Sequence, residues 1–310
     1  MKKEILFEIP GIYRDAFRVT GYTFGEGEKA LCIVGSMRGN ENQQLYCASR
    51  LVARLKRLEE DGKLIEGQQI LVIPCVNSYS INTKRRFWCI DNTDINRMFP
   101  GYDKGETTQR IAAGVFEQIK DYRYGVQFAS FYMPGAFVPH IRMMKTGYED
   151  PQLAAEFGLP YVVVQPPRPF DTATLNYNWQ IWGVHGFSLY TTNTARIDPE
   201  SAQQAEDAVL NFMSRRGIIN YRAHGGYRSE IINGEDMVSL RAATSGFLQC
   251  LVKPGQRVEK GQLLATILDP YEGTVRSELR APVYGVVAFA GDEPMTYENT
   301  AVLKLIPEVE

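Results

Sequence analysis

The chain has 310 residues, of which 44% are hydrophobic and 23% charged, and its formal net charge at pH 7 is −2. This is the composition of a soluble globular protein with room for two domains. The absence of a basic tract argues against a nucleic-acid partner. No apolar run approaches the ~20 residues that cross a bilayer, so we expect no membrane partner. Residues 1–5 lack the apolar segment of a signal peptide.

The five cysteines form no C-x-x-C pair and have apolar neighbours; they are Cys32, Cys47, Cys75, Cys89 and Cys250. An odd number of such cysteines is typical of buried thiols in a reducing compartment, so we expect a cytoplasmic protein. A thiolate metal site or nucleophile at Cys75 or Cys89 is the alternative interpretation. The chain has only three histidines, which restricts any metal site.

The first two thirds of the chain read as strands alternating with helices. Apolar residues at helical spacing, with charge on the opposite face, predict a long helix over residues 41–58. Asp198-Pro199-Glu200 is a strong helix start, so a last helix is expected to end near Arg215. The expected strands are residues 4–9, 17–24, 30–34, 69–76, 124–130, 137–143, 161–165 and 186–192, and the other helices are 107–120, 149–157 and 171–184.

After residue 228 the pattern changes to short strands separated by Gly and Pro turns. Strands are expected over residues 237–243, 246–251, 263–268, 282–289 and 301–306. We therefore predict an α/β domain at residues 1–228 and a small all-β domain at residues 229–310.

Two stretches of the sequence are candidate ligand-binding sites. The buried strand 30–34 runs into Gly35-Ser36-Met37-Arg38-Gly39-Asn40-Glu41 and then into the long helix, and open α/β sheets bind ligands at such strand ends. Residues 82–101 have no regular period and are expected to form a loop. That loop carries three arginines, Arg85, Arg86 and Arg97.

The second stretch contains a recognisable motif. Residues 94–101, Asp-Ile-Asn-Arg-Met-Phe-Pro-Gly, resemble the D-L-N-R-x-F-P-G motif of the succinylglutamate desuccinylase/aspartoacylase family, whose members are zinc amide hydrolases related to zinc carboxypeptidases. Residues 35–41 resemble the family's G-x-x-H-G-x-E zinc motif, and residues 74–77 resemble its V-P-x-x-N strand end. Residues 252–261 and 281–286 are similar to segments of a C-terminal domain found in some members.

This resemblance implies a zinc-carboxypeptidase-like mixed sheet flanked by helices, followed by a barrel-sandwich-like β domain. It also implies a zinc ion held by two histidines and a glutamate, with a further glutamate as general base. Asn96 and Arg97 would bind the substrate carboxylate, with Arg86 and Arg142 as further candidates. The alternative role for Arg97 is a simple ion pair with Asp94 that orders the loop.

The chain departs from the family at the metal. Arg38 stands at the first histidine, and a guanidinium has no lone pair for zinc. Ala129 falls at the second histidine and Asn193 at the general base, while Glu41 keeps the glutamate position. We therefore expect no cofactor, with zinc as the alternative, and we expect the Arg38 guanidinium to replace the metal's charge and pair with Glu41.

The dense aromatic residues near the predicted site allow two interpretations, core packing or an apolar pocket for an acyl or aromatic group. They are Phe87, Trp88, Phe128, Phe131, Tyr132, Trp179 and Trp182. The β domain is also similar to lipoyl and biotinyl carriers, but its turn at residues 269–273 lacks the modified lysine. A shape-giving or oligomer-forming role follows, so a homo-oligomer is among the expected partners.

Three functions follow from this sequence. The leading one is a protein that binds a small carboxylate ligand, such as an N-acyl amino acid or a peptide end, without the family's zinc hydrolysis. The alternative is an active amide-bond hydrolase with a non-standard metal set or a metal-free mechanism. The third is an interaction scaffold that uses the β domain.

Overall fold

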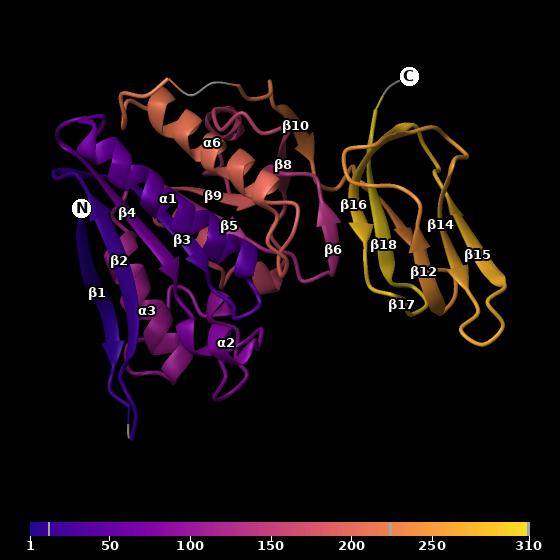
Figure 1. The fold of residues 1–310 in the computed structure, drawn as a ribbon, viewed down its shortest axis with the longest axis horizontal. Coiled ribbons are helices and arrows are strands. Elements are labelled where there is room, and N and C mark those ends of the chain that lie inside the picture. The colour runs from indigo at the N-terminus through magenta and orange to yellow at the C-terminus, as the bar shows by residue number, and fades with distance from the viewer. Residues whose placement is uncertain (12, 223–224, 309–310) are drawn as a thin grey trace. The chain divides into compact units, whose positions relative to one another are not determined.

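The computed structural model describes residues 1–11, 13–222 and 225–308 (Figure 1). Contacts along the chain divide it into two compact units, Met1–Ser130 with Pro139–Ile231, and Phe131–Val138 with Ile232–Glu310. The stretch Phe131–Val138 therefore packs with the second unit, although it lies inside the predicted first domain.

The first unit is built on a nine-stranded sheet in the order β1-β2-β4-β3-β5-β9-β7-β8-β10. Strands β3, β4, β5 and β9 run parallel, whereas β1–β2, β2–β4 and β7–β9 pair antiparallel, so the sheet is mixed. The strands are β1 (Lys2–Ile9), β2 (Phe17–Phe24), β3 (Glu28–Ser36), β4 (Gln68–Cys75), β5 (Tyr124–Ala129), β7 (His140–Met144), β8 (Tyr161–Gln165), β9 (His185–Tyr190) and β10 (Glu230–Asn233).

Helices cover both faces of this sheet. Alternate residues of β3 face opposite layers: Leu31 and Ile33 join a core with α1 and α6, while Cys32 and Val34 join a core with α3 and α5. Helices α1 and α6 lie side by side (Figure 1). The helices are α1 (Asn42–Glu60), α2 (Ser78–Thr83), α3 (Thr107–Ile119), α4 (Pro151–Ala155), α5 (Leu175–Ile181) and α6 (Pro199–Arg215), with 3-10 helices η1 (Ile95–Arg97) and η2 (Pro169–Asp171).

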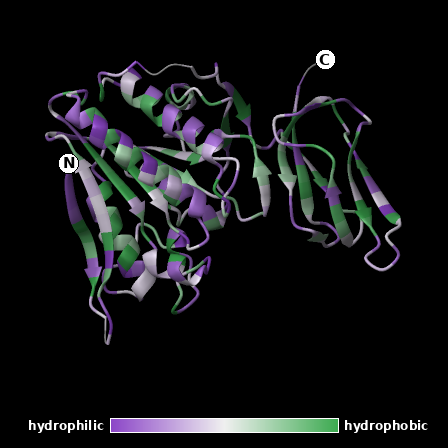
Figure 2. Cartoon of the chain, in the orientation of Figure 1, coloured by the Kyte–Doolittle hydropathy of each residue, from purple (hydrophilic) through white to green (hydrophobic). Residues whose placement is uncertain are grey.

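A strand segment buried on both faces must be apolar, as β3 is at residues 30–35. A helix against one face needs a single apolar stripe, and α1 carries both green and purple residues in Figure 2. The α/β fold class is thus confirmed, and the parallel strands β3, β4, β5 and β9 place their carboxyl ends at one edge of the sheet.

The second unit consists of two antiparallel sheets around an apolar core. One sheet has the order β11-β18-β16-β13 with β6 added against β16, and the other has the order β15-β14-β12-β17. Its strands are β6 (Gly135–Phe137), β11 (Val238–Arg241), β12 (Gly246–Cys250), β13 (Arg257–Val258), β14 (Leu263–Leu268), β15 (Val275–Arg280), β16 (Gly285–Gly291), β17 (Met295–Thr296) and β18 (Ala301–Pro307). The expected C-terminal all-β architecture is therefore present.

Three predicted elements differ in the structure. The expected strand 137–143 is divided at Pro139, which lacks an N–H for a ladder, into β6 of the second unit and β7 of the first. The expected helix 171–184 shortens to Leu175–Ile181, and the loop 82–101 contains the 3-10 turn Ile95–Arg97. Among the described residues, none forms a helix long and apolar enough to cross a membrane.

Candidate functional site

The turn between β3 and α1 is held in place by backbone contacts. The Ser36 hydroxyl donates to the Arg38 carbonyl at 2.7 Å, and the Gly39 N–H donates to the Arg86 carbonyl at 3.1 Å. A Cβ at Gly39 would lie 2.2 Å from the Arg85 carbonyl oxygen and 2.3 Å from Ser80 backbone atoms, so only glycine fits this close approach. The turn is therefore locked against the segment that carries Arg86.

Glu41 lies at the end of this turn and is fully buried. Its Oε2 accepts from the N–H groups of Met37 at 2.7 Å and Arg38 at 3.0 Å. Its Oε1 accepts from Arg38 Nη1 at 3.0 Å and from the Ser130 hydroxyl. A carboxylate has about four lone-pair sites, so these four donors occupy the hydrogen-bonding capacity of Glu41.

Arg38 is buried between two carboxylates. Besides its contact with Glu41, its Nε and Nη2 donate to both oxygens of Asp94, at 3.1 and 2.8 Å. The burial of Arg38 opposes its charge, but Glu41 and Asp94 outweigh that effect and raise the pKa of its guanidinium. The Arg38–Glu41 pair expected from the sequence is present. Arg38 stays cationic and is held by a fork of charge-assisted hydrogen bonds.

Arg86 is half-buried beside this cluster and differs from Arg38 in its surroundings. Burial, followed by the nearby charge of Arg38, lowers the pKa of its guanidinium. Its side chain lies over the Phe87 ring, 5.5 Å from the centroid. Within residues 1–11, 13–222 and 225–308, no acceptor or carboxylate bonds to that side chain. Arg86 is therefore a partly desolvated cation available for an anion.

Arg97 of the motif contacts η2, and Asn96 contacts the start of α5. Arg97 Nη1 contacts Asp171 at 3.2 Å and also the Phe170 carbonyl, while Asn96 Oδ1 accepts from the Leu175 N–H at 3.3 Å. The alternative pairing of Asp94 with Arg97 is thus wrong, because Asp94 binds Arg38 and Asp171 binds Arg97.

The other sequence-predicted positions lie around the same sheet edge or beyond it. Ala129 ends β5, and its carbonyl accepts from Gln44 at 3.2 Å. The Asn193 side chain turns to Asp198, at 3.5 Å. Arg142 lies on β7 and donates to the Tyr190 hydroxyl at 3.3 Å.

One residue of the cluster, Ser130, was missed from the sequence, and so was the contact between Asp94 and Arg38. Ser130 follows Ala129 directly and is the residue whose side chain reaches Glu41, which its position at a strand end would have allowed us to anticipate. The alternative interpretation paired Asp94 with Arg97, whereas Asp94 pairs with Arg38. Desolvation raises the pKa of the Cys75 thiol to about 12, so this group is protonated at neutral pH and is not an activated nucleophile.

Comparison with known proteins places this site in a family. A family model, the succinylglutamate desuccinylase/aspartoacylase catalytic domain, matches residues 27–216, more than half of the chain. The chain belongs to the succinylglutamate desuccinylase/aspartoacylase family. The match includes the Arg38–Glu41 turn, the Asn96-Arg97 motif and the strand end at Ser130.

Several relatives of this family member extend the match to nearly the whole chain. An N-alpha-acetyl-L-2,4-diaminobutyric acid deacetylase from Halomonas elongata is 24% identical over 87% of this chain and 79% of its own length. A succinylglutamate desuccinylase from a Silicibacter species superimposes with a TM-score of 0.83 at 17% identity, covering 98% of this chain and 94% of that one. The product-bound ectoine utilization protein EutE (DoeB) from Ruegeria pomeroyi gives 0.79 at 18% identity, covering 98% and 94%. These structures share the fold of both units.

Proposed function

We propose that this family member binds a small carboxylate ligand, such as an N-acyl amino acid or a peptide end, without the family's zinc hydrolysis. The observation that carries the proposal is the Arg38 guanidinium, which lies 3.0 Å from Glu41 and 2.8 Å from Asp94. A cation that pairs with Glu41 supplies the positive charge that a metal would bring.

The residues around Glu41 do not fit a zinc ion. Zinc takes Cys, His, Asp or Glu ligands, and no group of three or more of these is placed to hold a metal in the described part of the chain. Both Glu41 oxygens already accept two hydrogen bonds each. A zinc ion at Glu41 would meet the Arg38 cation and displace at least one of these donors.

Arg86 supports the choice of a carboxylate ligand. It is the half-buried arginine beside the cluster, whereas Arg38 and Arg97 each contact an acidic side chain. A guanidinium matches the two oxygens of a carboxylate. The Halomonas relative acts on an N-acetylated amino acid, a compound of the proposed ligand class.

Metal analysis separates this proposal from the alternative hydrolase. The purified protein is incubated with zinc, dialysed and analysed for bound metal, and it is assayed with N-acetyl amino acids. We expect less than stoichiometric zinc and no hydrolysis. Stoichiometric zinc, together with hydrolysis that Glu41→Ala abolishes, would overturn the proposal.

Ligand binding is tested by thermal shift with the same N-acetyl amino acids. A ligand at about 100 times its Kd stabilises by about 2.7 kcal/mol, which corresponds to roughly 5–11 °C in Tm. Arg86→Gln should remove this shift, whereas Arg85→Gln, which changes an exposed neighbour, should keep it. Equal shifts in both variants would show that Arg86 does not bind the carboxylate.

A further inference from the structure

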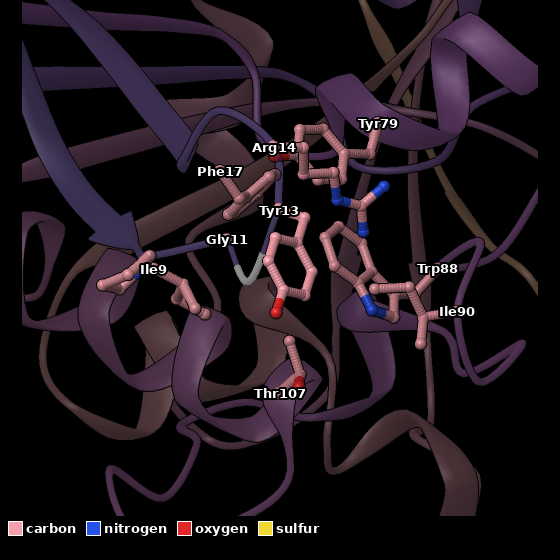
Figure 3. A pocket seen from close by; sticks show the side chains of 10 residues that line it. Ile9, Gly11, Tyr13, Arg14, Phe17, Tyr79, Trp88, Ile90 and Thr107 are labelled. Atoms are coloured by element: carbon pink, nitrogen blue, oxygen red, sulfur yellow. The ribbon is translucent and has the colours of Figure 1, made fainter.

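One exposed apolar surface of the first unit is a cavity of about 640 Å³ at the connection between β1 and β2 (Figure 3). The Trp88 and Phe17 rings behind it are 2% and 3% exposed, so this aromatic wall is closed to a ligand. A more regular apolar surface lies on the second unit, on the outer face of the four-stranded sheet β15-β14-β12-β17.

The register of the strands defines the outer face of this sheet. Leu248 of β12 pairs with Ile267 of β14, and both pack in the apolar core of the unit. Because successive residues of a strand point to opposite faces, the next pair, Phe247 with Leu268, points away from that core. The Phe247 side chain is accordingly 40% exposed.

This outward pair is the middle of an apolar row that crosses all four strands. Val275 of β15 pairs with Leu268, and Met295 of β17 pairs with Phe247. Val275 is 56% exposed and Met295 is 50% exposed. The apolar row therefore consists of Val275, Leu268, Phe247 and Met295, one residue from each strand.

Two exposed tyrosines lie next to the apolar row. Tyr271, in the turn that joins β14 to β15, is 98% exposed, and Tyr297, directly after β17, is 79% exposed. Since a whole aromatic side chain buries about 150–250 Å², the row and the two tyrosines together expose roughly 600 Å², as much as the largest apolar patch of a typical monomer. Two such surfaces in contact would bury about 1,200 Å², the lower limit of a standard protein–protein interface.

The charged groups beside the apolar row are balanced. Glu278 pairs with Arg280 at 2.8 Å, and Arg276 pairs with Asp269. A contact between two identical copies brings like charges together, so a face with unpaired charge would repel itself. A face with balanced charge accepts a second copy, whereas a nucleic acid or an anionic membrane requires an excess of basic groups.

We propose that this face binds a second copy of the chain, so that the apolar rows of the two copies pack against each other. The contact is two-fold symmetric, and each copy presents the same surface. Phe247 lies in the middle of the row and is the aromatic anchor of the interface, with Glu278 and Arg280 in its polar rim. Self-association needs no ligand, so this inference does not depend on the carboxylate site proposed at Arg86.

Sedimentation velocity of the whole chain over a micromolar concentration series tests the proposal. We expect a monomer–dimer equilibrium with a micromolar Kd, since the interface is near the lower limit of size. Phe247→Glu and Met295→Glu each place an unpaired carboxylate in the contact and should raise the Kd at least about tenfold. Ile90→Glu adds the same charge at a 62% exposed residue of the first unit and should leave the Kd unchanged.

Urea unfolding of each variant shows whether the fold is kept. If Phe247→Glu does not fold, Met295→Glu decides the question, because Met295 is half exposed on a strand of two residues. The inference would be overturned if the chain stays monomeric throughout the series, if the folded row variants dimerise with the original Kd, or if Ile90→Glu weakens the dimer as much as they do.

Discussion

Replacing Arg38 by methionine tests the buried charge cluster directly. The substitution keeps a long side chain but leaves Glu41, which is fully buried, without its cation, and it leaves Asp94 at 14% side-chain exposure without its arginine. Removing one partner of a buried pair costs about 3–5 kcal/mol. We expect the free energy of unfolding to fall by that amount, which is roughly 6–20 °C in Tm.

Urea unfolding of Arg38→Met is best measured beside two further variants. Arg123→Met removes an exposed pair with Glu28, at 2.8 Å, and should cost at most about 1 kcal/mol. The double variant Arg38→Met/Glu41→Gln removes the more deeply buried of the two stranded charges and should recover about 1–3 kcal/mol relative to Arg38→Met. A loss in Arg38→Met no larger than that in Arg123→Met, or no recovery in the double variant, would refute the reasoning.

Three further predictions concern the metal position, the thiols and the core. Arg38→His/Ser130→His should bind zinc and gain Tm on its addition, because the Ser130 side chain, directly after β5, contacts Glu41. Arg38→His/Ala129→His should not bind zinc, because no contact joins the Ala129 side chain to Glu41 in the described residues; zinc binding by the Ala129 variant would contradict this. Burial raises the pKa of the Cys47 and Cys75 thiols to about 12, above the unfolded value of about 8.5. The stability that the two thiols contribute is therefore fully present below pH 8.5 and is lost as the pH rises. We expect the free energy of unfolding to fall by about 1.4 kcal/mol per thiol between pH 7.5 and 9.5. Urea midpoints at the two pH values measure this, and Cys75→Ala should lower the pH dependence by one thiol's share; an unchanged slope would count against it. Leu51→Ala, at a fully buried position of α1, should lower the free energy of unfolding in urea by about 2–5 kcal/mol. Lys56→Ala, on the exposed face of the same helix, should change it by no more than about 0.5 kcal/mol. Equal losses in the two variants would mean that the buried face of α1 does not stabilise the core.

Local patterns predicted the elements whose own residues determine them. Helix α1 repeats its apolar residues every three to four positions, and β3 has a continuous apolar run at residues 30–35, so both were found within two residues of their bounds. Strand β15 was missed because Val-Arg-Ser-Glu-Leu-Arg carries charges at alternate positions and is mostly exposed. Its strand state comes from pairing with β14, a non-local contact.

In the candidate site, too, contacts between neighbours in the sequence were predicted and contacts between distant residues were not. Glu41 and Arg38 are three residues apart in one turn, so their pair followed from the sequence. Arg38 and Asp94 are separated by 56 residues, and Arg97 and Asp171 by 74, and nothing local decides which arginine meets which carboxylate. Only the tertiary fold brings these partners together, by packing the loop of residues 82–101 against the β3–α1 turn and against η2.

The small strand β6 makes the second unit discontinuous along the chain. Residues Phe131–Val138 leave the first unit directly after Ser130, pair with β16 through Phe137 and Phe289, and then return to β7. A fragment of residues 229–310 would therefore lack one strand of its five-stranded sheet and expose the edge of β16. A peptide of residues 131–138 contains β6, which pairs with that edge in the whole chain. We therefore expect the peptide and the fragment to reassemble.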